Sequence, residues 1–198
     1  MSAEALPHRS LGRHQPAARR GSVWSIAPRV VLALALLVLG VLVVANERSF
    51  TALEARLGTH LIQAAFADQA VTATTRGDPS IAFAVGADWW ALRVTTECAI
   101  ALYIGPLLAF AGLFVAFPSI SLVRTAWALV VAGVTLVLLN QARLVGLGYV
   151  FAEWGLNAYD WAHSLVGSFL MIFGVAGCLT LFFFAVIRPS RRGRSRTR

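Results

Sequence analysis

The stretch SLVGSFLMIFGVAGCLTLFFFAVI, residues 164–187, contains 24 residues and no charged side chain. A helix needs about 20 apolar residues to cross the hydrocarbon core of a bilayer. Three further runs have comparable length: residues 26–45, interrupted only by Arg29, residues 98–117 and residues 125–142. The sequence therefore predicts an all-α membrane protein built on a four-helix transmembrane bundle.

The composition agrees with this class and argues against a nucleic-acid partner. Hydrophobic residues make up 58% of the chain and charged residues 13%, whereas a soluble domain carries roughly 25% charged residues. The net charge is +8, but eleven of the 17 arginines lie in residues 1–29 and 188–198. Basic tails beside apolar spans contact lipid head groups and set topology. We expect a disordered basic cytoplasmic tail at residues 1–29 and a basic cytoplasmic tail at residues 188–198, around a transmembrane domain at residues 30–187.

The first apolar run allows two interpretations. A secretory signal peptide would end near Ala45 and be removed. However, residues 1–29 form a long lead for a signal peptide, which favours an uncleaved membrane anchor over residues 26–45.

Residues 46–66 are predicted to form an amphipathic helix outside the bilayer. One face carries Phe50, Leu53, Leu57 and Leu61 at helical spacing. Such a helix either lies on the membrane surface or packs against the bundle.

The stretch between this helix and the second span changes character. Residues 70–94 combine β-branched residues with turn signals at residues 77–79 and 86–88, which predicts a small β meander. Residues 144–161 contain three glycines and are expected to form a short linker before the last span.

Loop charge predicts the orientation of the spans. With four spans, residues 1–29, 118–124 and 188–198 share one side, which holds twelve arginines and one acid. The other side holds five arginines and eight acids. The positive-inside rule therefore assigns both termini to the cytoplasm and loops 46–97 and 143–163 to the extracytoplasmic side.

This topology brings three reactive side chains, Cys98, Arg143 and His163, to the outer ends of three spans. A helix N-terminus and a nearby cation favour a cysteine thiolate, so Cys98 is the candidate nucleophile. His163 at a helix start would be the general base, and Arg143 would stabilise a developing oxyanion. A cysteine with a histidine and an electrostatic helper is typical of acyl transfer. Taken singly, each residue also has an ordinary explanation: a small apolar filler, a snorkelling anchor or an interfacial histidine.

Three supporting residues lie close in sequence to these candidates. Asn140 shares a helix face with Arg143. Asp160 is expected to cap the last span or orient the imidazole of His163, and Glu97 either positions Arg143 or faces water. Two cysteines and four scattered histidines give no metal-site spacing, and Cys178 lies too deep in its span to form a disulfide with Cys98.

Three short motifs resemble the exosortase/archaeosortase family of membrane cysteine transpeptidases. They are Thr95-Thr96-Glu97-Cys98-Ala99-Ile100, Asn140-Gln141-Ala142-Arg143 and Trp161-Ala162-His163-Ser164. The resemblance covers roughly residues 50–187, although many family members read Cys-Ser-Gly where this chain has Cys98-Ala99-Ile100. It implies a compact or divergent member in which Cys98, Arg143 and His163 are catalytic and no cofactor or metal is required.

The implied activity is cleavage of C-terminal sorting signals of exported proteins at the extracytoplasmic face of the cell membrane. Such substrates carry a short signature, a transmembrane helix and a basic cluster, and their acyl group passes to an acceptor. The alternative is a non-enzymatic membrane scaffold or an accessory subunit of a surface-polymer or secretion system. A small transporter is disfavoured because the spans lack charge at their midplane.

Overall fold

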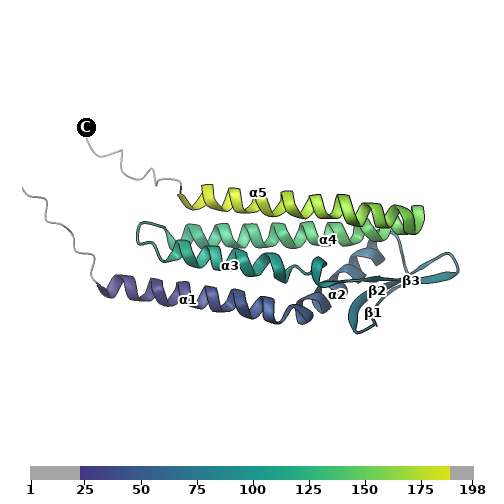
Figure 1. The fold of residues 1–198 in the computed structure, drawn as a ribbon, viewed down its shortest axis with the longest axis horizontal. Coiled ribbons are helices and arrows are strands. Elements are labelled where there is room, and N and C mark those ends of the chain that lie inside the picture. Colours follow the sequence, from purple (N-terminus) through teal and green to yellow (C-terminus); the bar gives the residue numbers. More distant parts are fainter. Residues whose placement is uncertain (1–22, 188–198) are drawn as a thin grey trace, which may run out of the picture.

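The computed structural model describes residues 23–187, so the tails expected at residues 1–22 and 188–198 lie outside the described residues. In chain order the elements are α1 (Val23–Ala45), α2 (Glu47–Ala65), β1 (Ala70–Thr75), β2 (Asp78–Val85), β3 (Asp88–Arg93), η1 (Thr96–Cys98), α3 (Ala101–Val115), α4 (Leu122–Trp161), η2 (Ala162–Gly167) and α5 (Ser168–Ile187). The predicted mostly helical fold with a small sheet is confirmed. Figure 1 shows α1, α3, α4 and α5 side by side, with α2 and the sheet at one end.

Two helical stretches are long and apolar enough to cross a membrane. They are Ile26–Ala45 and the nearly continuous stretch Leu122–Ile187, whereas Ala101–Val115 is a shorter apolar helix. The first stretch has the predicted bounds. Residues 23–29, however, belong to α1 rather than to a disordered tail.

Helix α1 packs closely on α3 along a line of glycines. A Cβ atom added to Gly40 would lie 2.7 Å from the carbonyl oxygen of Gly105, and one added to Gly112 would lie 2.8 Å from that of Ala33. At the start of α1, the Arg29 guanidinium donates hydrogen bonds of 2.9 Å to two carbonyl oxygens in the turn between α3 and α4. Arg29, the charged residue of the first apolar run, thus binds carbonyl oxygens of the chain itself.

Helix α2 contacts the rest of the molecule through a face that the sequence pattern did not indicate. The buried residues are small or polar: Thr51, Glu54, Ala55, Gly58, Thr59 and Ile62. Leu53, Leu57 and Leu61 are exposed instead. Small side chains allow close packing, since a Cβ on Gly58 would lie 2.7 Å from the Ile81 side chain. Packing against the bundle thus uses the opposite face, and the leucines point outward.

The predicted β meander is confirmed as an antiparallel sheet in the order β1-β2-β3. Its two turns use left-handed backbone at Arg76, Gly77 and Gly86. Ile81 and Phe83 on β2 are buried and belong to the same apolar cluster as Ala55 and Ile62 of α2. The sheet therefore packs against α2 at one end of the helices (Figure 1). Strand β3 leads directly into the segment that carries Cys98.

The expected linker at residues 144–161 is helical, and this prediction was wrong. Helix α4 continues to Trp161, and the chain changes direction at Gly155, whose φ is 77° and ψ is −170°. Glycine adopts positive φ without a steric penalty, so one residue suffices for the break. The other two glycines of the stretch remain helical. Residues 162–167 then form a π-helical turn, η2, before α5.

Candidate active site

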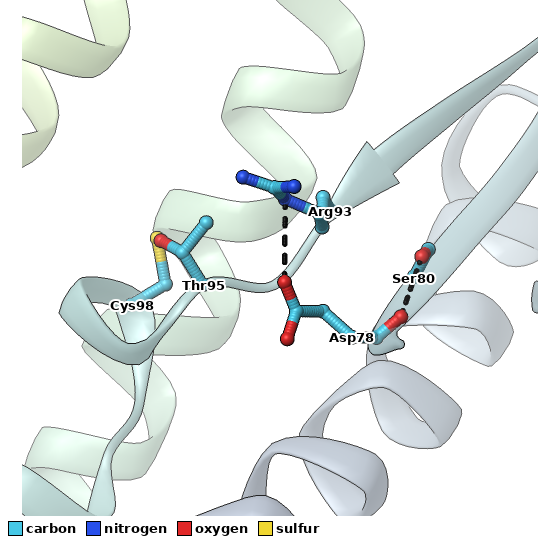
Figure 2. Close-up of polar contacts among 5 residues, drawn as sticks. All are labelled: Asp78, Ser80, Arg93, Thr95 and Cys98. Atoms are coloured by element: carbon cyan, nitrogen blue, oxygen red, sulfur yellow. Dashed lines mark hydrogen bonds and ion pairs between the residues drawn. The ribbon is translucent and has the colours of Figure 1, made fainter. Parts of the chain in front are cut away.

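Cys98 lies in the short connection between the sheet and α3. It ends the 3-10 turn η1, three residues before α3 begins at Ala101, and its side chain is 2% exposed. The Thr95 hydroxyl donates a 3.7 Å hydrogen bond to the Cys98 sulfur, and the two side chains lie next to each other in Figure 2. Cys98 therefore precedes the second span instead of standing in its first turn.

An ion pair holds the sheet side of this connection. Arg93, the last residue of β3, lies 3.5 Å from the Asp78 carboxylate at the start of β2 (Figure 2). The Ser80 hydroxyl donates a 3.0 Å bond to the Asp78 carbonyl oxygen. Because Arg93 is two residues before Thr95, these contacts fix the point where the chain leaves the sheet.

Two polar side chains hold the other side of the connection. Asn140 on α4 is fully buried, and its amide donates to the Cys98 carbonyl oxygen at 2.9 Å. The same amide donates to the Glu54 carboxylate at 2.5 Å. Both carboxylate oxygens of Glu54 lie 3.2 Å from the Ile100 backbone nitrogen. Sequence reasoning identified Asn140 but missed Glu54, which lies on the face of α2 away from the predicted apolar stripe.

Arg143 is buried rather than snorkelling. Its side chain is 6% exposed, and a Cβ on Gly167 would lie 2.7 Å from its Nε atom. The guanidinium thus lies directly against the backbone of η2, the turn that also contains His163. A larger residue at position 167 would therefore displace the guanidinium from this contact between α4 and η2.

Tyr159 lies beside His163 and packs on the cluster that contains Cys98, and it was not among the residues predicted from the sequence. Its ring stacks on His163 with centroids 5.6 Å apart and planes 21° from parallel. The same ring packs against the buried apolar cluster that contains Cys98 and Leu144, the residue after Arg143. Tyr159 therefore lies between the turn that holds His163 and the cluster that holds Cys98. An aromatic four residues before a histidine on a helix is the only sequence signal for it.

The position of His163 differs from the predicted one. The helical stretch after Gly155 starts well before His163, so His163 lies inside η2 and does not open a span. Asp160 is inside α4, where its carbonyl oxygen accepts a 2.7 Å bond from Ser164, so the predicted helix cap is wrong. Glu97 belongs to η1, but its side chain is outside the described part of the structure, and its role stays a prediction.

A cavity of about 270 Å³ lies beside these residues. Its lining includes Trp90, Arg93, Thr95, Phe151, Tyr159 and His163, which come from β3, its exit and the helices on either side of Gly155. A larger apolar hollow of about 740 Å³ near Cys178 lies along α4 and α5, away from this chemistry. The smaller cavity combines aromatic walls with a histidine and an arginine, as ligand sites commonly do.

Buried polar atoms without a protein partner concentrate on one stretch of α4. Among the described residues, Asn140 Oδ1, both amide atoms of Gln141 and Arg143 Nε are buried and make no hydrogen bond. Each such atom costs about 1–3 kcal/mol. Orphaned polar atoms in a native fold usually have a functional reason, and here they lie beside Cys98 and His163.

Comparison with known proteins adds no assignment, because no family model, no curated protein and no solved structure matches the chain.

Proposed function

We propose that the protein is a membrane-embedded cysteine peptidase or transpeptidase that cleaves C-terminal sorting signals of exported proteins. The observation that carries the proposal is that one stretch of α4 reaches both of the other elements: Asn140 bonds the Cys98 carbonyl oxygen, and Arg143, three residues later, lies against η2, the turn that holds His163. Arginine is almost never buried unless it has a partner. The burial of Arg143 against the turn that holds His163 therefore favours a functional role.

In the proposed reaction, the Cys98 thiol transfers its proton to the imidazole of His163 and its sulfur attacks the scissile carbonyl carbon. The guanidinium of Arg143 stabilises the oxyanion that develops on the carbonyl oxygen. The carbon–nitrogen bond then breaks, and the imidazolium returns the proton to the leaving amine. An acceptor amine or water finally displaces the cysteine from the thioester, giving transfer or hydrolysis.

The membrane arrangement is part of the proposal: four spans, both termini in the cytoplasm and the site at the extracytoplasmic face. The start of α1, the turn after α3 and the end of α5 lie together at the end of the molecule opposite the sheet (Figure 1). In the sequence, these three points adjoin residues 1–29, 118–124 and 188–198, which together hold twelve arginines and one acid, and this supports the assignment of that end to the cytoplasm. The close α1–α3 contact supports a retained anchor over a cleaved leader.

The proposal is tested with a co-expressed reporter that ends in a transmembrane helix and a basic cluster. The reporter's signature is varied as a peptide library, and cleavage is read as a mass shift. We expect Cys98→Ala to abolish cleavage and Arg143→Ala and His163→Ala to lower its rate about 100-fold or more. Cys178→Ala is the matched control and should cleave normally. Normal processing by the Cys98→Ala protein would refute the proposal.

A non-enzymatic scaffold is the competing function, and the low exposure of Cys98 favours it. In a scaffold, Cys98 only fills space beside the sheet. Cys98→Ser would then leave both the fold and the cellular phenotype unchanged, whereas an active-site cysteine does not tolerate this exchange.

A further inference from the structure

The acid Glu54 reaches the Cys98 connection from a distant part of the chain. It lies on α2, is 6% exposed, and accepts hydrogen bonds from the Ile100 backbone nitrogen with both oxygens. Ile100 is the residue before α3 begins. A carboxylate at this position satisfies a backbone N–H that has no partner within the helix and interacts favourably with the helix dipole.

Asn140 joins this carboxylate to the other side of the same short segment. Its amide nitrogen donates to Glu54 at 2.5 Å and to the Cys98 carbonyl oxygen at 2.9 Å. The main chain is thus held just after Cys98 and again at Ile100, by two side chains that also bond to each other. Between these points lies only Ala99, which is fully buried.

This arrangement is costly for a role in packing alone. Burial raises the pKa of Glu54 from 4.5 to about 7, although both hydrogen bonds act in the opposite direction. Apolar residues of similar volume commonly replace buried charged groups without loss of stability. A buried carboxyl that bonds the backbone on one side and Asn140 on the other instead fixes geometry.

We propose that Glu54 is a positioning residue that, through Ile100 and Asn140, fixes the segment from which the Cys98 sulfur projects. The inference rests on the proposed function in one respect, the role of Cys98 as nucleophile. It deepens that function by making α2, an element outside the predicted spans, part of the catalytic apparatus.

The test uses the two cysteines of the full-length protein as paired reporters. N-Ethylmaleimide is reacted with the purified protein in detergent, and labelling of Cys98 and Cys178 is followed by mass spectrometry of the peptides. Both thiols are buried, but Cys178 lies in α5 away from Glu54. The ratio of the two rates therefore separates loosening of the Cys98 segment from loosening of the whole fold.

We expect Glu54→Leu to raise the Cys98 to Cys178 rate ratio about tenfold, because two donors lose their acceptor. Glu54→Gln keeps an oxygen acceptor and should stay within about threefold of wild type. Glu47→Leu, on the same helix, is the control and should leave the ratio unchanged. If the leucine variant does not fold, Glu54→Asp withdraws the carboxyl by one methylene and should give an intermediate rise.

Three results would overturn the inference: an unchanged ratio in Glu54→Leu or its Glu54→Asp substitute, an equal rise at both cysteines, or no rescue by Glu54→Gln. In the cleavage assay, Glu54→Leu should lower kcat about tenfold with KM unchanged, whereas a merely destabilised protein would lose active fraction and recover it under stabilising conditions. The labelling ratio does not depend on catalysis. Failure of the proposed peptidase would therefore appear with Cys98→Ala in the cleavage assay, and failure of the positioning role would appear in the ratio.

Discussion

The two ends of the helical assembly bury different kinds of side chain. Away from the sheet, the shared core of α3, α4 and α5 is apolar and contains Leu107, Leu136 and Phe182. At the sheet end, Glu54 and Arg143 are buried together with the amides of Asn140 and Gln141. Leu136 and Asn140 are one helical turn apart on α4, so the change occurs within about 6 Å along one helix. Both ends contain buried apolar clusters, but within residues 23–187 the buried charged side chains lie at the sheet end, and burying them costs stability.

The largest effect should come from breaking the apolar end. Leu136 is 1% exposed in the core between α3, α4 and α5. Leu136→Ala should lower the free energy of unfolding by about 2–5 kcal/mol, because it removes buried methyl groups and leaves a cavity. Denaturant titration in detergent measures the loss. A cost below about 0.5 kcal/mol would show that this end does not carry the stability.

At the polar end, the expected effect depends on pH. The folded-state pKa of Glu54, about 7, lies above its ordinary value of 4.5, so the folded protein binds the proton more tightly. Its contribution to stability is complete below pH 4.5 and is lost as pH rises through about 7, a change of about 3 kcal/mol. Cys98 and Arg143 are the other buried ionisable groups on the elements packed against α2 within residues 23–187.

Glu54→Gln should remove the loss of stability with rising pH, and Glu47→Gln on the same helix should not. Unfolding titrations at pH 4.5, 6 and 8 make the comparison. Parallel pH dependence of the wild type and Glu54→Gln would mean that Glu54 does not bear the buried proton.

A smaller effect is expected at the α1–α3 contact. Gly40→Ala places a methyl group 2.7 Å from the Gly105 carbonyl oxygen, and backbone cannot yield as a side chain does. We expect a loss of about 1–3 kcal/mol. Gly177→Ala is the matched control on α5, where a Cβ meets nothing within 4 Å, and helix propensity should make it neutral or stabilising. Equal effects of the two alanines would exclude close packing as the reason for Gly40.

Much of the architecture followed from local pattern. The bounds of the first span and the β meander were predicted because long apolar runs, β-branched residues and Gly-Asp turns act over a few residues. The helical course of residues 144–161 was missed because glycine is a weak guide within a long buried helix. Only Gly155 breaks the helix, and nothing in its neighbours distinguishes it from Gly146 and Gly148.

The site was predicted only in part, for a related reason. Cys98, Arg143 and His163 are rare polar residues beside apolar runs, so they stand out in the sequence. Glu54 and Tyr159 lie in mixed segments, where an acid or a tyrosine is ordinary. Their importance arises from tertiary contacts between α2, η1 and α4, which no local pattern encodes.

The π-helical turn at residues 162–167 has a consequence for how this chain tolerates insertions and deletions. A π-turn holds one residue more than an α-helical turn in the same length of helix. Deleting one residue there would restore regular α-helix but rotate everything before it by about 100° relative to α5. Gly167 would then no longer lie against Arg143. The extra residue thus sets the rotation of the preceding helix relative to α5. Chains that share this chemistry should therefore preserve the length of this turn even where its sequence varies.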